Sequence, residues 1–225
     1  VLRAAVQAGV RRVVMTSAAA AARAPVGTDQ TADETMWTDL AARRYDPYRV
    51  SKVIAEREAW AYMDTHGGRT QFCTILPGAV FGPVLTPGRN NSAGIIAGLL
   101  RGKPPRLPRF GFFVVDVRDL AELHVRAMTA PAAAGQRFLA TGEFMWMGDV
   151  AQMLRAGLGD AAAKVPTHAM PDFAVRVLAV FLPSLRMLAK DVGRINRVSS
   201  AKAQRLLGFA PRPARQTVLD CARSL

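Results

Sequence analysis

Apolar segments of strand length alternate with longer segments of helical spacing, and this alternation limits the fold more than any other feature. Residues 70–76 (TQFCTIL) are rich in β-formers, are too short for a helix and end abruptly at Pro77, as a buried parallel strand does. Residues 10–15 (VRRVVM) indicate a second short strand, and residues 2–9 before it have helical spacing. The pattern predicts an α/β fold with a mainly parallel sheet.

The same alternation continues along the chain. Further strands are expected over residues 112–115 and 136–140. Further helices are expected over residues 47–67, 93–100, 117–128, 147–157, 173–188, 199–207 and 213–224. Because helices dominate the last third of the chain, we expect a small helical lobe packed on the sheet.

Composition excludes a spanning membrane protein. The chain has 225 residues and is 50% hydrophobic, which is enough to bury a core. The most apolar stretch, residues 173–188, is interrupted by Arg176, Pro183 and Arg186, so it is not a bilayer span. The first residues lack the pattern of a secretory signal. A cytoplasmic location without a membrane partner is the expectation.

Charge and cysteine content narrow the function classes further. The formal charge is +13, but the arginines are dispersed and no stacking aromatic residues are interleaved with them, so we expect no nucleic-acid partner. Cys73 and Cys221 make neither a disulfide framework nor a metal cluster, and three scattered histidines add no ligand spacing. No metal site is predicted.

The sequence YRVSK places Tyr48 and Lys52 at positions i and i+4 of an expected helix, on one face. A tyrosine has a pKa of about 10, and a neighbouring cation lowers that pKa towards the neutral range. Such a phenol can give a proton to a carbonyl oxygen while hydride arrives at carbon. The alternative is a chance pair, with Tyr48 an ordinary helix residue and Lys52 a solvated charge.

Several further motifs occur in order around this pair. Thr16-Ser17 ends a strand, Asp33-Glu34 and Trp37 lie in the next loop, PGAVFGP (77–83) follows the second strand, and VVDVRDLA (114–121) comes later. This succession resembles the extended short-chain dehydrogenases/reductases, the NAD-dependent epimerase/dehydratase family. Within that family it is most similar to the branch of dihydroflavonol reductases, cinnamoyl-CoA reductases and aldehyde reductases. The resemblance covers nearly the whole chain.

The resemblance implies a role for each matching position. It makes Tyr48 the general acid–base and has Lys52 bind the nicotinamide ribose and lower the tyrosine pKa. The segment Pro77, Gly78, Ala79 and Val80 would line the nicotinamide of NADP or NAD with backbone groups. Thr16 and Ser17 fall on the segment that supplies a serine to hold the substrate oxygen, so Ser17 is the third catalytic candidate.

This chain departs from the family pattern at that serine. The family reads Thr-Ser-Ser with the second serine catalytic, whereas this chain reads Thr16-Ser17-Ala18. Either Ser17 or Thr16 substitutes, or the activity is reduced or altered. The alternative for Ser17 is a strand-end hydroxyl that satisfies neighbouring polar groups.

The glycine-rich turn that holds a dinucleotide pyrophosphate is not found in the sequence. Gly94, Gly98 and Gly102 are four apart within or after a helical segment, so they are interpreted as packing or loop glycines. The resemblance therefore predicts a Rossmann-like doubly wound parallel sheet whose first half is missing, in an N-terminally truncated chain. We expect these 225 residues alone to bind NAD(P) weakly.

Four segments are expected along the chain. Residues 1–83 form the end of the dinucleotide-binding domain, residues 84–111 a substrate loop, residues 112–144 a return to the Rossmann sheet, and residues 145–225 a helical substrate-binding lobe. The pocket is expected from mainly apolar residues, which serve equally well as lobe core: Leu85, Ile95, Ile96, Phe110, Phe112, Met145, Trp146, Met147 and Phe173.

The predicted function is an NAD(P)-dependent oxidoreductase acting on a hydrophobic carbonyl or alcohol. One alternative is a sugar-nucleotide epimerase or dehydratase, but such enzymes carry Arg-x-x-Asn before the Phe81-Gly82-Pro83 turn, where this chain has Leu76-Pro77-Gly78-Ala79. Another is a non-catalytic member, suggested by Ala18. His124 and Asp116 are expected to be structural. An uncovered sheet edge makes a homodimer a candidate assembly.

Overall fold

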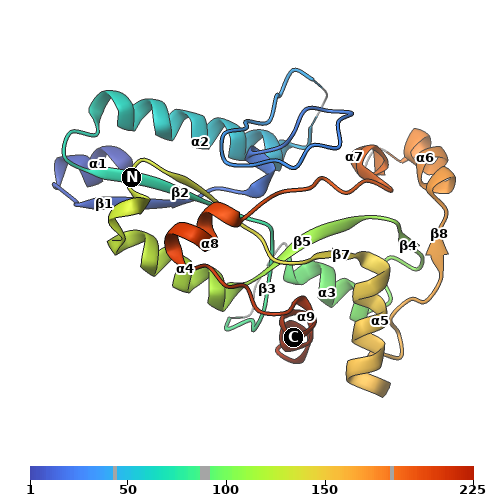
Figure 1. The fold of residues 1–225 in the computed structure, drawn as a ribbon. Helices are drawn as coiled ribbons and strands as arrows, with labels where there is room; N and C mark the ends of the chain where they lie inside the picture. The colour runs from blue at the N-terminus through green and yellow to red at the C-terminus, as the bar shows by residue number, and fades with distance from the viewer. Residues whose placement is uncertain (43–44, 87–91, 183–184) are drawn as a thin grey trace. The chain divides into compact units, whose positions relative to one another are not determined.

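The computed structural model describes residues 1–42, 45–86, 92–182 and 185–225 (Figure 1). The chain divides into two compact units. Unit 1 comprises Val1–Gly78, Asp119–Thr141 and Asn196–Ala210; unit 2 comprises Ala79–Arg118, Gly142–Ile195 and Pro211–Leu225. Each unit is described by itself.

Unit 1 is built on a parallel sheet of order β1-β2-β6. Its strands are β1 (Arg12–Thr16), β2 (Gln71–Pro77) and β6 (Arg137–Ala140). In β2, six of the seven residues are buried, which explains its continuous apolar sequence, because both faces of a parallel sheet are covered. The long helix α2 (Pro47–His66) lies on one face and α8 (Ala201–Leu207) on the other, where it contacts β6 (Figure 1). The predicted α/β fold with a parallel sheet is confirmed.

The remaining elements of unit 1 are short or peripheral. They are α1 (Leu2–Gln7), the 3₁₀ turn η1 (Ala19–Ala21), η2 (Pro131–Ala133) and the part of α4 (Val117–Thr129) that starts at Asp119. The alanine-rich stretch after β1 is buried at Ala21 and Ala22, which pack against Val53 of α2 and Leu76 of β2. Small side chains are needed there because the chain runs between a helix and the sheet.

Unit 2 is a smaller lobe with two small sheets. In the first, β3 (Ala79–Phe81) pairs in parallel with β5 (Gly111–Asp116), which pairs antiparallel with β7 (Phe144–Trp146). In the second, β4 (Leu107–Pro108) pairs with β8 (Ala169–Met170). The helices are α3 (Ala93–Leu100), α5 (Met147–Leu158), α6 (Asp172–Phe181), α7 (Arg186–Asp191) and α9 (Ala214–Arg223), with the 3₁₀ turn η3 (Gly159–Ala162).

Helices α3, α5 and α9 and the strand β5 enclose the core of unit 2. Its fully buried members include Ile96, Leu99, Val150, Leu154 and Val218. Gly157 of α5 lies against Leu219 of α9, where a built Cβ would come within 2.5 Å of the leucine side chain. A larger residue there would force the two helices apart.

The segment boundaries differ from the sequence-based expectation in two places. The strand over 112–115 is β5 of unit 2, so the expected return of residues 112–144 to the Rossmann sheet holds only for the part from Asp119 to Thr141. The expected lobe 145–225 loses residues 196–210, because α8 packs on β6 of unit 1. Which unit a segment belongs to depends on long-range strand pairing and helix packing. Local periodicity in the sequence carries no information about either.

The helix expected over 173–188 is two helices, α6 and α7, and residues 183–184 between them lie outside the described residues. Residues 87–91 of the expected substrate loop also lie outside them. The three-residue strands β3 and β7 were not predicted, because so short a run has no readable period. Across the described part of the chain, no helix has both the length and the apolarity that a bilayer crossing requires.

Candidate active site

The N-terminus of α2 presents Tyr48 and Lys52. Asp46 is the N-cap, and its carboxylate accepts a hydrogen bond from the Arg49 backbone nitrogen at 2.9 Å, while Pro47 occupies the first turn. Tyr48 is 54% exposed. The Lys52 Nζ atom lies 6.0 Å from the centroid of the Tyr48 ring. The expected one-face arrangement of the two side chains is therefore present.

Lys52 reaches from the helix to the end of β1. Its Nζ donates to the Thr16 carbonyl oxygen at 3.4 Å. Thr16 pairs in register with Ile75 of β2, and Pro77 pairs with Ala140 of β6. Tyr48, Lys52 and Thr16 thus belong to the edge where the parallel strands of unit 1 end, which is where open α/β sheets bind ligands.

His124 holds the Thr16 side chain. Its Nδ1 lies 2.8 Å from the Leu120 carbonyl oxygen, and its Nε2 lies 2.8 Å from Thr16 Oγ1. A carbonyl oxygen only accepts, so in the neutral ring Nδ1 carries the hydrogen and Nε2 accepts from the threonine hydroxyl. His124 was expected to be structural, and its contacts agree with that interpretation.

The environment of Tyr48 differs from the expectation that Lys52 lowers its pKa. The pKa of Tyr48 is raised above 10.0, first because burial disfavours the phenolate and second because the Asp46 carboxylate repels it. At 6.0 Å from the ring, Lys52 does not offset these two effects. In this structure the phenol is therefore held in its protonated form at neutral pH.

Ser17 points into the interior of unit 1. It is 2% exposed, and its Oγ donates to Glu56 Oε2 at 2.6 Å. Its backbone nitrogen donates to the Ile75 carbonyl at 2.8 Å. The structure therefore places the Ser17 hydroxyl in a buried polar network, as the structural alternative supposes, and among the described residues no hydrogen bond joins it to Tyr48. Ala18, where the family pattern has the second serine, is 5% exposed.

Glu56 is the centre of this buried network. It is fully buried, and its Oε1 accepts from Thr74 Oγ1 and from Arg137 Nε, both at 2.8 Å. Arg137 in turn donates from Nη1 to the carbonyl oxygens of Glu34 and Met36, each at 2.8 Å. These bonds join the residue that follows β1 to α2, β2 and β6.

Two loop residues singled out in the sequence also belong to this network. The Trp37 ring centroid lies 3.7 Å from the Arg137 guanidinium carbon, a stacked cation–π contact. Glu34 Oε1 accepts from the Leu139 backbone nitrogen at 2.9 Å. Neither Glu56 nor Arg137 was predicted from the sequence as part of the site. The available signal was a glutamate one turn after Lys52, on the helix face that carries the buried Val53 and Ala59.

Comparison with known proteins decides the family. Residues 1–140 match the profile of the NAD dependent epimerase/dehydratase family, which is more than half of the chain. The chain belongs to this family. The matched part includes the predicted site residues Thr16, Ser17, Tyr48, Lys52, Pro77, Gly78, Ala79 and Val80.

Individual members of the family are also similar to this chain in sequence. Ketoreductase adrE of Penicillium rubens is 33% identical over 156 residues, covering 65% of this chain and 46% of that protein. Cinnamoyl-CoA reductase CAD2 of Medicago truncatula is 36% identical over 134 residues, covering 57% of this chain and 40% of that protein. The chain spans about half the length of the curated relatives that it matches.

Among solved structures, Gre2 of Candida albicans in complex with NADPH superimposes with a TM-score of 0.77 at 26% identity. The match covers 99% of this chain and 67% of that one. The fold of this family, a Rossmann-like sheet with a C-terminal lobe, is therefore shared by the chain.

The residues present fit the nicotinamide-ribose end of the NAD(P) cofactor. Tyr48, Lys52 and the Thr16 carbonyl at the strand ends supply a phenol, an ammonium group and a backbone oxygen, which suits ribose hydroxyls and a reacting carbonyl. Gly94 and Gly98 lie inside α3, so they form no phosphate-binding turn. The four expected nicotinamide residues continue from β2 into β3, where Ala79 and Val80 pair with Val114 and Val115 of unit 2.

Unit 2 contains a cavity of about 700 Å³, the lobe cavity. Its apolar walls include Leu107 and Pro108 of β4, Trp146, Ala151 of α5, and Met170 with Pro171. Of the nine expected pocket residues, Trp146 lines it. Ile96, Met145 and Met147 belong to the core of unit 2, and Ile95, Phe110 and Phe112 pack against that core. Leu85 and Phe173 are exposed. Most of the set therefore serves as lobe core.

Proposed function

We propose that this chain carries the proton-transfer residues and the substrate lobe of an NAD(P)-dependent carbonyl reductase. The observation that carries the proposal is the position of Tyr48 and Lys52 on one face of α2, with Lys52 Nζ bonded to the Thr16 carbonyl where the parallel strands end. When bound, NAD(P)H supplies the hydride.

Tyr48 is proposed as the general acid. Its pKa is raised by burial and by Asp46, so the phenol carries its proton at neutral pH. A protonated phenol can donate to a carbonyl oxygen on which negative charge develops, which is the need of the reduction direction. Since Tyr48 is 54% exposed, a substrate oxygen can approach its hydroxyl.

Lys52 is proposed to bind the ribose hydroxyls of NADP or NAD. The Thr16 carbonyl holds its ammonium group at the strand ends, where a cation can donate hydrogen bonds to ribose hydroxyls. Pro77, Gly78, Ala79 and Val80 are proposed to line the nicotinamide with backbone groups. The Gly78 nitrogen already donates to the Ala140 carbonyl at 3.1 Å, which fixes the start of this segment.

Ser17 is proposed to act through Glu56 and not on the substrate. Its hydroxyl is committed to the buried carboxylate, and Thr16 Oγ1 is bonded to His124. Neither hydroxyl therefore replaces the serine expected at Ala18. We infer that this reductase works with a weaker hold on the substrate oxygen than the family pattern provides.

The relatives support reduction of a carbonyl substrate. They include proteins named as a ketoreductase and a cinnamoyl-CoA reductase, and a structure titled as an NADPH complex. The lobe cavity, of about 700 Å³, is of the size that holds small organic ligands. We propose a hydrophobic ketone or aldehyde as the substrate class.

The test is reduction of a panel of hydrophobic carbonyls by the complete gene product that contains these residues, with NADH and with NADPH. Tyr48→Phe is expected to lower kcat by about a hundredfold or more, because the proton donor is lost. Tyr62→Phe is the matched control, since Tyr62 lies on the same helix and stacks on His66. The ratio of rates with the two nicotinamides identifies the cofactor.

Two outcomes would overturn the proposal. Equal activity of wild type and Tyr48→Phe would remove Tyr48 from the chemistry. Binding of NAD(P)H without any carbonyl turnover would favour a sugar-nucleotide epimerase or a non-catalytic member, which Ala18 also suggests. The 225 residues alone are expected to bind NAD(P) weakly, and a micromolar dissociation constant by calorimetry would contradict that expectation.

A further inference from the structure

We propose that the lobe cavity takes a ligand with an apolar body and an anionic group, and that Arg155 binds the anion with help from Arg109. The identification of this ligand as the carbonyl substrate rests on the proposed function. The binding itself rests only on unit 2.

The cavity walls are mainly apolar, but they carry more positively charged than negatively charged side chains. Its lining contains the guanidinium groups of Arg109 and Arg155 and a single carboxylate, that of Asp172. Arg109 Nη2 pairs with Asp172 Oδ2 at 2.5 Å. Within the part of the chain that the structure describes, no carboxylate forms an ion pair with Arg155. One cation of the cavity is therefore left without a counter-charge.

Arg155 is held in place by backbone groups. Its Nη1 donates to the carbonyl oxygens of Val165 at 3.1 Å and Ala163 at 3.2 Å. These bonds fix the guanidinium at the wall of the cavity without neutralising its charge, because carbonyl oxygens are dipoles and not ions. A guanidinium that is positioned in advance loses little entropy when it binds a carboxylate or phosphate.

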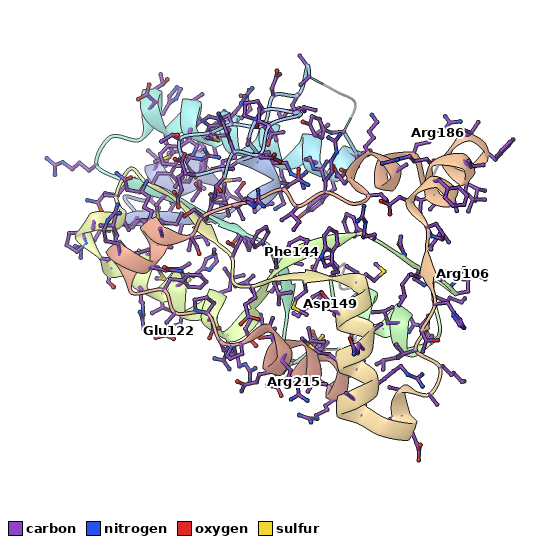
Figure 2. All side chains as sticks on the ribbon, turned by 45° about the vertical axis from the view of Figure 1, so that its right-hand side comes forward. Arg106, Glu122, Phe144, Asp149, Arg186 and Arg215 are labelled. Atoms are coloured by element: carbon purple, nitrogen blue, oxygen red, sulfur yellow. The ribbon has the colours of Figure 1, made fainter. Side chains whose placement is uncertain are left out.

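The chain segment around β4, which contributes to the cavity wall, is also basic. Residues 101–109, which lead into and out of β4, contain four basic residues and no acidic one: Arg101, Lys103, Arg106 and Arg109. All four are exposed. Arg106 directly precedes the strand pair β4 and β8, which contributes to the cavity wall (Figure 2). Such a field raises the local concentration of an anion and speeds its arrival.

The Arg109–Asp172 pair at the cavity wall packs tightly against Gly193. A Cβ built on Gly193 would lie 2.5 Å from Arg109 Nη2 and 2.8 Å from Asp172 Oδ2, and the Gly193 nitrogen donates to the Arg109 carbonyl at 2.7 Å. The pair is thus a defined part of the wall. Removing the carboxylate would release a second guanidinium for an anionic ligand.

Calorimetry with octanoate, octanol and octylammonium tests the inference without any hydride transfer, because the three probes share one alkyl chain. Octanoate is expected to bind about tenfold more tightly than octanol at low salt. Octylammonium is expected to bind more weakly than either. The preference for octanoate should shrink in 1 M salt, where charge interactions are screened within about 3 Å.

Three variants test whether the preference for octanoate over octanol arises in the lobe cavity. Arg155→Gln should abolish the preference for octanoate over octanol, and Asp172→Asn should increase it because Arg109 is released. Arg215→Gln, on the exposed side of α9 and labelled in Figure 2, removes a cation outside the cavity and should change neither affinity. Asp172→Asn keeps the test decisive if Arg155→Gln fails to fold.

The inference is overturned if wild type binds octanoate and octanol equally, or if folded Arg155→Gln and Asp172→Asn both retain the wild-type preference. Failure of the proposed function has a different signature: anion binding that depends on Arg155, without Tyr48-dependent turnover of any carbonyl. For an active enzyme, the ratio of kcat/KM between an aryl keto acid and its methyl ester should fall about tenfold in Arg155→Gln.

Discussion

Ser17 Oγ donates to Glu56 Oε2 at 2.6 Å, so the strand end beside the site is joined to the helix that carries Tyr48 through a buried carboxylate. We propose on this relationship that Ser17 belongs to the framework of the site and does not act on the substrate. It can be tested by comparing stability and activity in the same variant.

Ser17→Ala should lower stability by about 1–3 kcal/mol, because a buried carboxylate loses one of its donors. Its kcat/KM should fall less than about tenfold, since the hydroxyl is bonded to Glu56. Thermal unfolding and steady-state rates measure the two effects. A loss of activity as large as that of Tyr48→Phe, in a variant of unchanged stability, would show that the hydroxyl acts on the substrate.

Ala18→Ser should raise kcat by about tenfold or more, because it restores the hydroxyl that the family pattern places next to the reacting oxygen. Ala18 is also the N-cap of the 3₁₀ turn Ala19–Ala21, where serine is a favourable residue, so the melting temperature should not fall. Rates and melting curves of the two forms decide the matter. An unchanged kcat would show that the family geometry is absent at this position.

Removing one partner of the buried Glu56–Arg137 pair should cost about 3–5 kcal/mol, because an unpaired charge is left in the interior. Glu56→Leu and Arg137→Met should therefore each be severely destabilising, and the double variant should lose less than the sum of the two. Urea unfolding gives the three values. Glu122→Gln is the control, because its ion pair with Arg126 is exposed and should matter by less than about 1 kcal/mol. If the double variant loses as much stability as the two single variants together, Glu56 and Arg137 are not coupled.

The rate of reduction should be constant through neutral pH and fall only in the alkaline range, because the Tyr48 phenol must be protonated and its pKa is raised above the ordinary tyrosine value. Asp46→Asn should move the fall to lower pH, since the carboxylate that helps to raise the pKa is removed. Asparagine still caps α2, so the helix is retained. Superimposable pH profiles of the two forms would contradict the role of Asp46.

Neither cysteine should react with a thiol reagent at pH 8 in the folded chain. Both are fully buried, and burial raises the pKa of the Cys73 thiol to about 11 and raises that of Cys221 as well. The reactive thiolate is therefore scarce and shielded. Labelling followed by mass spectrometry should show both thiols modified only after denaturation. Rapid labelling of one cysteine in the native state would refute this.

The sequence by itself determined the local elements and the shared helix face of Tyr48 and Lys52, the pair proposed for proton transfer. Strand β2 and helices α2, α3 and α5 could be predicted because each has a readable period and a clear end, such as Pro47 before α2 and Pro77 at the end of β2. The Tyr48 and Lys52 positions followed from helical spacing alone, since positions i and i+4 of a helix always share a face.

The tertiary structure alone decided what surrounds that pair. Glu56, Thr74 and Arg137 are 18 to 81 residues apart, and only strand pairing and helix packing bring them together around Ser17. The uncompensated Arg155 and the division of the last 80 residues between two units depend on the same long-range contacts. Local periodicity reports which face of an element is apolar. It carries no information about which distant element covers that face, and burial, pairing and pKa all depend on that cover.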